Sequence, residues 1–287
     1  MAGQLSFRLT PLDVDVARKG VLLSVSAPHT PRQNHLLAAL PAEEYEFLLP
    51  DLEPVPLPVS RIIHSAGELE KHLYFPTAGV VSRYNVTESG ASAEFAVTGN
   101  EGVIGIALFL GGDSTPGQSV VVSEGYAYRL KAALLKNVLD RNRPLMHLLL
   151  HYTLALMAQT AQSVVCNRHH SLEQRLCVWI LSCQDRLASN ELTMTQELIA
   201  QMLGMRRESV TEAAGKLQKM GLIHYSRGHI AVLDRSRLEA QACECYAVVK
   251  REYDRLLHPE NAHRHAGLHD GCRQHLAHIG KDFTILN

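Results

Sequence analysis

The sequence predicts an α+β protein, in which an antiparallel β domain is followed by a helical C-terminal half. Between Arg61 and Leu130, short runs rich in Val, Ile, Phe and Tyr alternate with Gly, Asn and Ser, as strands and turns do. From Pro144 to Asn167 the chain contains no Asp, Glu, Lys or Arg, which indicates a long buried helix. Further on, two short amphipathic segments meet at Gly204. Strands without helices between them favour a small sandwich or barrel.

Composition limits the function classes. A chain of 287 residues is long enough for two modest domains. Its net charge of -1 gives no overall attraction to nucleic acid, so any such binding must be local. All six cysteines lie in the second half and none forms a CxxC pair. This pattern favours a reducing, cytoplasmic location.

The N-terminal part is expected to be a flexible tail followed by two short helices. Residues 1–30 show no sustained periodicity, and the apolar run from Val21 to Val25 is too short for a signal peptide. Asn34 to Leu49 has helical spacing, and Pro41 starts a second helix. The prolines of "DLEPVPLPVS" then end the helical part, and "KAALLKNVLDRN" predicts a helix that leaves the β domain.

The uncharged helix suggests a dimer. Its first turns have hardly any polar face, with apolar residues at Leu145, Leu148, Leu149, Tyr152, Leu156 and Met157. One side can pack on the β domain, and the other needs a cover, most simply the same helix of a second chain. The central helix of a monomer remains the alternative. A membrane span is not expected, because His147, His151 and Gln159 would be costly in hydrocarbon.

The segments around Gly204 have the layout of a helix-turn-helix. One helix is expected over Thr195–Leu203 and a second over Arg206–Met220, with a glycine turn between them. In such a motif the first residues of the second helix reach base edges in the major groove. Apolar residues on both sides of Ser226-Arg227-Gly228 then predict a β-hairpin, which would form a wing.

The chemistry of this region suits DNA. Arg206 and Arg207 can bind guanine or phosphate through two hydrogen bonds, and Glu208 can accept one from cytosine. From Gln201 to Arg237 there are seven Lys or Arg and three Asp or Glu. An ordinary helical hairpin with solvated arginines is the alternative. The expected DNA-contacting residues are Thr195, Gln196, Arg206, Arg207, Glu208, Ser209, Thr211, Glu212, Lys216 and Arg227.

Over roughly Asn34 to Glu239 the sequence resembles the Crp/Fnr family of bacterial transcription regulators. The "RRESV" segment is similar to the family's recognition-helix signature, so the likeness makes Arg207 and Glu208 base readers. Glu212 stands where the family typically has a third reader, an arginine. The resemblance implies a β-roll sensor, a dimerisation helix and a winged helix-turn-helix. The expected segments are a flexible tail over 1–30, the sensor over 31–142, the dimerisation helix over 143–168, the winged helix-turn-helix over 169–240, and a C-terminal helix with a flexible His-rich tail over 241–287.

The sensor departs from relatives that bind cyclic AMP. The segment "EGVIGIALFLGGDSTPGQSVVV" resembles the family's phosphate-binding cassette. There, Ile106 or Ala107 replaces a glutamate for the ribose, and Gly117-Gln118 replaces an Arg-Ser pair for the phosphate. A buried phosphate without a cation is costly, so tight cyclic-nucleotide binding is not expected. The candidate effector-binding residues are Gly105, Ile106, Ala107, Gly117 and Gln118.

No cofactor or metal is predicted. The iron–sulfur cluster of Fnr-type relatives needs cysteines in the N-terminal half, and none precedes Cys166. His64 and His72 are expected to be ordinary surface or core residues; haem ligation by one of them is the less favoured alternative. Cys243 and Cys245 lie in an amphipathic helical pattern, where a spacing of two points side chains to different sides. The histidines of the C-terminal tail form no fixed repeat; they are His258, His263, His265, His269, His275 and His278.

The sequence therefore predicts a homodimeric, sequence-specific regulator of transcription that binds double-stranded DNA at a pseudo-palindromic site. RNA polymerase and an unidentified small-molecule effector are further candidate partners. A small β-barrel enzyme is disfavoured, because the β region shows no paired carboxylates, nucleophile elbow or phosphate loop. The other alternative is a protein-interaction scaffold that no longer reads DNA, which the acidic Glu212 suggests.

Overall fold

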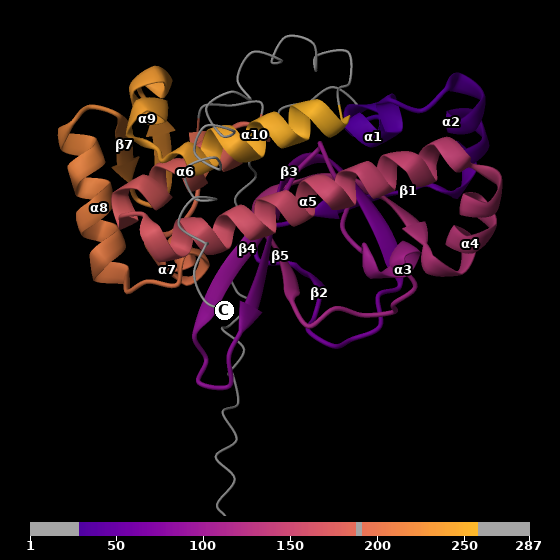
Figure 1. The fold of residues 1–287 in the computed structure, drawn as a ribbon, viewed down its shortest axis with the longest axis horizontal. Coiled ribbons are helices and arrows are strands. Elements are labelled where there is room, and N and C mark those ends of the chain that lie inside the picture. The colour runs from indigo at the N-terminus through magenta and orange to yellow at the C-terminus, as the bar shows by residue number, and fades with distance from the viewer. Residues whose placement is uncertain (1–28, 188–190, 258–287) are drawn as a thin grey trace, which may run out of the picture.

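A computed structural model describes residues 29–187 and 191–257. The predicted α+β class is confirmed: an antiparallel sheet is followed by a long helix and then a helical region with a small second sheet (Figure 1). Most of the tail predicted over 1–30, and the part of the segment predicted over 241–287 that follows residue 257, lie outside the described residues.

The first half forms an antiparallel sheet preceded by short helices. Its strands pair in the order β1-β5-β3-β4, with β2 also on β5. The elements are the 3-10 turns Pro31–Gln33 and Leu49–Asp51, helices α1 (His35–Ala38), α2 (Ala42–Leu48) and α3 (Ala107–Leu110), and strands β1 (Glu53–Leu57), β2 (Ile62–His64), β3 (His72–Val86), β4 (Ser92–Thr98) and β5 (Gln118–Lys131).

Strand β1 was not anticipated, because its segment contains Pro54 and Pro56. Proline cannot donate a backbone hydrogen bond, so it is tolerated mainly in strands at the edge of a sheet. β1 is such an edge strand: it pairs with β5 alone, from Glu53 opposite Arg129 to Leu57 opposite Gly125. The prolines do end the helical part, and the β domain begins there.

The second half begins with two helices and continues with further helices and a small three-stranded sheet. The three strands pair in the order β6-β8-β7. The elements are α4 (Ala132–Arg141), α5 (Arg143–His169), α6 (Leu172–Gln184), β6 (Glu191–Thr193), α7 (Gln196–Leu203), α8 (Arg207–Lys219), β7 (Ile223–Ser226), β8 (His229–Val232), α9 (Arg235–Gln241) and α10 (Glu244–Leu257).

Helix α5 contains the long uncharged segment that the sequence predicts to be helical, but only part of its surface is covered. Leu145, Leu149 and Tyr152 are fully buried against the sheet, and the Tyr152 hydroxyl lies 2.9 Å from that of Thr98. α10 runs alongside α5 (Figure 1). A stripe on α5 remains exposed, formed by Leu150, Leu154, Met157, Val164 and Val165. No helix among the described residues combines the length and apolarity that a bilayer crossing needs.

The sensor sheet and the C-terminal region share one hydrophobic core. Val80, Val97 and Val122 of the sheet belong to the same buried cluster as Trp179 of α6 and Met202 of α7. In addition, the Ser92 hydroxyl at the start of β4 donates to the Gln201 carbonyl in α7 over 2.9 Å. The helix-turn-helix region is therefore packed directly on the sensor.

Candidate nucleic-acid interface

The turn between α7 and α8 is built by local chemistry. The Thr195 hydroxyl caps α7 by accepting the Leu198 amide over 3.2 Å. Gly204 ends α7 in the left-handed conformation at φ 62°, which glycine adopts without steric cost. A side chain there would place its Cβ 2.9 Å from the Ser92 carbonyl oxygen. α8 then starts at Arg207 and buries Val210 against the core.

The start of α8 presents charged side chains to solvent. Arg206, Arg207 and Glu208 are exposed, and Ser209 is half-buried. Within the described part of the chain, the side chains of Arg206 and Arg207 form no hydrogen bond or ion pair. Two guanidinium groups therefore lie at the N-terminal end of α8, and their N–H donors are available to a ligand.

Four other predicted contact residues already have partners: Gln196, Thr211, Glu212 and Lys216. The Thr211 hydroxyl donates to Gln196 Oε1 over 2.8 Å, which links α8 to the start of α7. Lys216 Nζ lies 3.0 Å from Glu212 Oε1 and 2.7 Å from Glu173 Oε1. Lys216 is thus shared by two carboxylates, and part of the negative charge of Glu212 is neutralised within α8.

The wing has the geometry that its sequence predicts. In β7 and β8, Ser226 is opposite His229. Arg227 and Gly228 between them have φ angles of 49° and 83°, the positive pair that a type I′ hairpin turn requires. Arg227 is exposed at the tip. The third strand, β6, was not anticipated; it pairs with β8 on the other side.

The β3–β4 hairpin lies next to the start of α8. Residues Gly90 to Ser92, at the β3–β4 turn, line a cleft of about 690 Å³ together with Met205, Arg206, Arg207 and Glu208. Arg175 of α6 also donates to the Leu203 carbonyl at the end of α7. The β3–β4 hairpin therefore borders the surface that α8 presents, and α7 is held both by Ser92 of β4 and by Arg175 of α6.

The two ends of the cassette contact opposite ends of β3. Gly105, at φ 107°, leaves no room for a Cβ beside the His72 carbonyl oxygen, and Ile106 and Ala107 follow at the start of α3. A Cβ on Gly117 would lie 2.9 Å from Asn85 Oδ1. Gln118 accepts the Tyr84 hydroxyl over 2.9 Å.

A buried arginine in the sensor had no signal in the sequence. Arg83 on β3 is 5% exposed, and its Nη2 donates to the Val103 carbonyl over 2.9 Å. Its Nε has no hydrogen-bond partner. This guanidinium comes from a strand that the sequence motif does not include.

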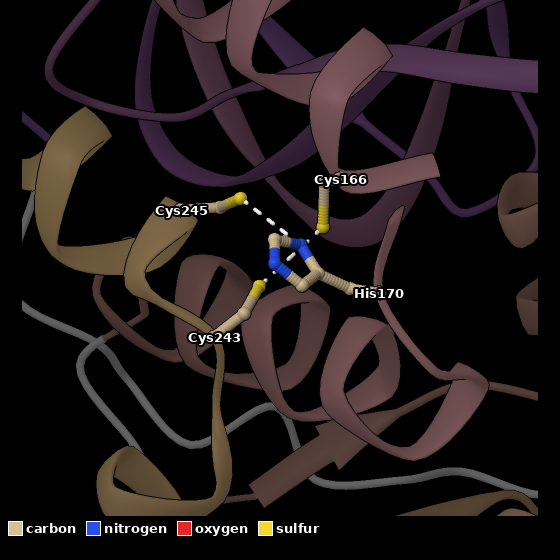
Figure 2. A group of neighbouring side chains, drawn as sticks. All are labelled: Cys166, His170, Cys243 and Cys245. Carbon is tan, nitrogen blue, oxygen red and sulfur yellow. Dashed lines mark hydrogen bonds between the residues drawn. The ribbon is translucent and has the colours of Figure 1, made fainter. Parts of the chain in front are cut away.

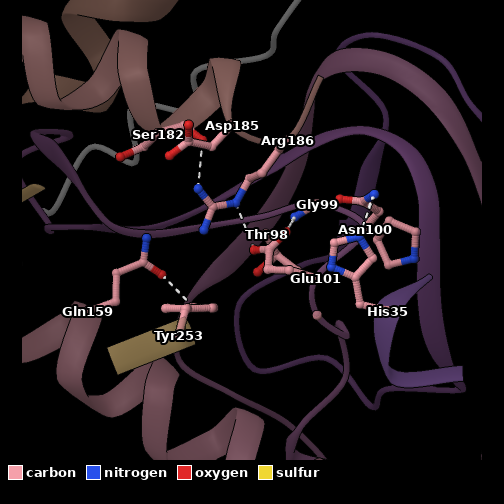
Figure 3. Close-up of polar contacts among 12 residues, drawn as sticks. His35, Thr98, Gly99, Asn100, Glu101, Gln159, Ser182, Asp185, Arg186 and Tyr253 are labelled. Atoms are coloured by element: carbon pink, nitrogen blue, oxygen red, sulfur yellow. Dashed lines mark hydrogen bonds and ion pairs between the residues drawn. The ribbon is translucent and has the colours of Figure 1, made fainter. Parts of the chain in front are cut away.

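A cluster of polar side chains links the β domain to the C-terminal half (Figure 3). We call it the polar joint; its members are Glu101, Gln159, Arg186 and Tyr253. Arg186, just after α6, pairs with Glu101 of the sensor over 2.7 Å, and both side chains are nearly buried. The Arg186 guanidinium lies 5.7 Å from the ring centre of Tyr253 in α10, and the Tyr253 hydroxyl donates to Gln159 of α5 over 3.0 Å. Burial acts to lower the pKa of Arg186, but the charge and hydrogen bond of Glu101, together with Tyr253 and Cys183, raise it above its ordinary value overall.

Comparison with known protein families agrees with this architecture. Residues 54–142 match the cyclic nucleotide-binding domain, and residues 174–241 match the Crp-like helix-turn-helix domain. The chain is 24% identical over 205 residues to electron transport regulator A of Shewanella oneidensis, covering 65% of this chain and 77% of that protein. It is also 24% identical over 194 residues to regulatory protein HlyX of Actinobacillus pleuropneumoniae, covering 62% and 76% respectively.

Solved structures share the fold. FixK2 from Bradyrhizobium japonicum superposes with a TM-score of 0.58 at 17% identity, covering 67% of this chain and 98% of that one. The c-di-GMP responsive global regulator CLP from Xanthomonas campestris gives a TM-score of 0.54 at 16% identity, covering 68% and 100%. At these identities the likeness concerns the fold alone.

Proposed function

We propose that this member of the Crp/Fnr family of transcription regulators binds double-stranded DNA as a homodimer and reads its site with the start of α8. One observation carries the proposal: Arg206, Arg207 and Glu208 are exposed at the first turn of α8, and the two arginines have no side-chain partner among the described residues. An arginine in the major groove can bind guanine through two hydrogen bonds, and a glutamate can accept one from cytosine.

The exposed stripe of α5 supports the homodimer. Met157 and Val164 are 64% and 67% exposed, and they lie on one face with Leu150 and Leu154. A contiguous apolar stripe on a long helix is the kind of surface that a second copy covers. A two-fold axis through α5 would pair two α8 helices, so the expected site is a pseudo-palindrome with half-sites one helical turn apart.

Cyclic AMP is not the expected effector. Gly117, at the position where the family's phosphate-binding arginine would fall, has Asn85 and Phe95 within close range of a Cβ. The guanidinium of the buried Arg83 already donates a hydrogen bond to the Val103 carbonyl. Millimolar cyclic AMP should therefore leave the thermal midpoint unchanged, and a rise of several degrees would contradict this part of the proposal.

The experiment is a selection of random duplexes by the purified full-length chain, read by sequencing, followed by a salt titration on the winning duplex. We expect an enriched palindrome whose affinity falls steeply with salt, since phosphate contacts dominate such binding. Arg207→Ala should cost about 1–3 kcal/mol in binding to that duplex and relax specificity at one base position.

The matched control is Arg251→Ala, which removes an exposed arginine of α10 and should leave the binding unchanged. A folded dimer that enriches no sequence, with Arg207→Ala indistinguishable from wild type, would favour the interaction-scaffold alternative. Activity as a DNA-bound regulator also implies a cytoplasmic location, and RNA polymerase is the partner to test next on the selected duplex.

A further inference from the structure

Four potential metal ligands from two distant segments meet beside the junction of α5 and α6. They are Cys166 and His170 at the end of α5, and Cys243 and Cys245 at the start of α10. Their ligand atoms all lie within 4.8 Å of one another. Figure 2 shows the four side chains pointing toward a common centre, with the imidazole among the three sulfur atoms.

Local geometry explains why each pair can act together. Cys166 and His170 are four positions apart, so both lie on one face of the helix end. Cys243 and Cys245 would point to different sides if both were helical, but α10 begins only at Glu244. Cys243 therefore approaches from the connecting segment, and both thiols reach the same cluster. All three cysteines are buried and His170 is partly buried.

Two of the distances between ligand atoms are close to those of a tetrahedral site. Zinc binds sulfur at about 2.3 Å and nitrogen at about 2.0–2.1 Å, which separates two sulfurs by about 3.8 Å and a sulfur from a nitrogen by about 3.5 Å. Here Cys166 Sγ lies 3.6 Å from Cys243 Sγ, and Cys245 Sγ lies 3.4 Å from His170 Nδ1. The widest pair, at up to 4.8 Å, needs to close by about 1 Å.

The surroundings also suit a metal centre. His170 Nε2 lies 3.3 Å from Glu244 Oε1, so a carboxylate partners the ring nitrogen that is not the one in contact with Cys245. Metal-bound histidines commonly have such a partner, which fixes the ring orientation. Gln162 Nε2 donates to Cys245 Sγ over 3.2 Å. Arg175 lines the same pocket as Cys166 and Cys245, so a cationic side chain stands near the charge that thiolates would bring.

We propose that Cys166, His170, Cys243 and Cys245 form a tetrahedral zinc site that fastens α10 to the end of α5. Three sulfurs and one imidazole, with no carboxylate among the four ligands, form the donor set of a closed structural zinc site. The site would fix the C-terminal helix at the point where Ser171 begins α6, the first helix of the DNA-binding region. This inference does not depend on the proposed function.

The test measures metal in the full chain, produced without an affinity tag and dialysed against a mild chelator. We expect one zinc per chain by elemental analysis. Cys245→Ser and His170→Gln should each lower the retained zinc at least about tenfold. Cys183→Ser is the matched control, because Cys183 is a buried cysteine of the α6 core outside the cluster; it should retain the metal.

Two further measurements cover the case in which a variant does not fold. Wild-type apoprotein titrated with Co²⁺ should show the sulfur-to-metal charge-transfer band and the intense visible bands of a tetrahedral thiolate site. A strong chelator should lower the thermal midpoint of the wild type by about 5 °C or more, with no effect on Cys245→Ser.

Several results would overturn the proposal. One is a wild-type chain without zinc or Co²⁺ binding; another is a Cys166–Cys243 disulfide in freshly isolated protein. Iron and acid-labile sulfide in the isolated protein would show that the four residues hold an iron–sulfur cluster and not zinc. Zinc that persists in the Cys245→Ser and His170→Gln variants would assign the metal to the histidines after residue 257 instead.

Discussion

Arginines occupy two contrasting positions in this molecule. Arg207, at the start of α8, is exposed and has no side-chain partner among the described residues. Arg186, in the polar joint, has a side chain that is only 9% exposed and is paired with Glu101 over 2.7 Å. An exposed charge costs little to keep and stays available to a ligand, whereas a buried charge depends on its partner. The contrast separates residues that hold the domains together from residues that are free to bind.

The largest effect is expected in the polar joint. Arg186→Met should lower the free energy of unfolding by about 3–5 kcal/mol, because it leaves Glu101 buried without its cation. Urea unfolding followed by circular dichroism measures the loss. The double variant Arg186→Met/Glu101→Gln should lose less than Arg186→Met alone, since no uncompensated charge remains.

The matched control for that prediction is Arg129→Met. Arg129 pairs with Glu53 over 3.1 Å, but the two side chains are 31% and 39% exposed. Its removal should cost no more than about 1 kcal/mol. Equal losses in Arg129→Met and Arg186→Met would show that burial does not distinguish the two pairs.

The next effect concerns Glu94, on the sensor strand β4 that faces α6. Burial of its carboxyl group raises the pKa to about 7, although the Ser82 hydroxyl donates to it over 2.5 Å and Arg186 also acts to lower it. The native state therefore binds a proton that the unfolded chain releases near pH 4.5. Stability from this group is fully present below about pH 4.5 and is lost as pH rises to about 7.

Unfolding measured at pH 5 and pH 8 tests this linkage. From pH 5 to pH 8, the free energy of unfolding of the wild type should fall by at most about 3 kcal/mol on account of Glu94. Glu94→Gln should remove that part of the pH dependence. Glu88→Gln, an exposed carboxyl in the β3–β4 turn, should leave the pH dependence as it is. A Glu94→Gln profile parallel to the wild type would mean that the carboxyl stays ionised at the interface.

Sequence reasoning succeeded where the signals are local. The α7–α8 turn follows from helical spacing and a glycine at Gly204, and the wing follows from Arg227-Gly228 between apolar residues. Their geometry is set by residues within a few positions of one another. The predicted effector residues had only a motif resemblance behind them, and the structure sets the two ends of that motif against opposite ends of β3.

The joint and the cysteine cluster could not be predicted in this way. Glu101 and Arg186 are 85 positions apart, and Cys166 and Cys243 are 77 apart. No periodicity links residues at such separations, and only tertiary packing brings them together. The spacing of Cys243 and Cys245 pointed against a shared site because the helix was expected to include both. In the structure α10 begins at Glu244, so Cys243 lies before the helix and its side chain points in a different direction from the one that a helix would give it.

The smallest expected effect on stability belongs to Arg207. Arg207→Ala removes an exposed guanidinium whose side chain has no hydrogen bond or ion pair in the described part of the chain, and alanine favours the helix at least as well as arginine. The free energy of unfolding should change by no more than about 0.5 kcal/mol, measured by the same urea titration as for Arg186→Met. A loss of 2 kcal/mol or more would mean that Arg207 supports the packing of α8, for example through its electrostatic influence on Tyr225. Weaker DNA binding by Arg207→Ala could then reflect a damaged fold. An unchanged stability is therefore what allows the binding loss proposed for this variant to be assigned to a lost contact with DNA.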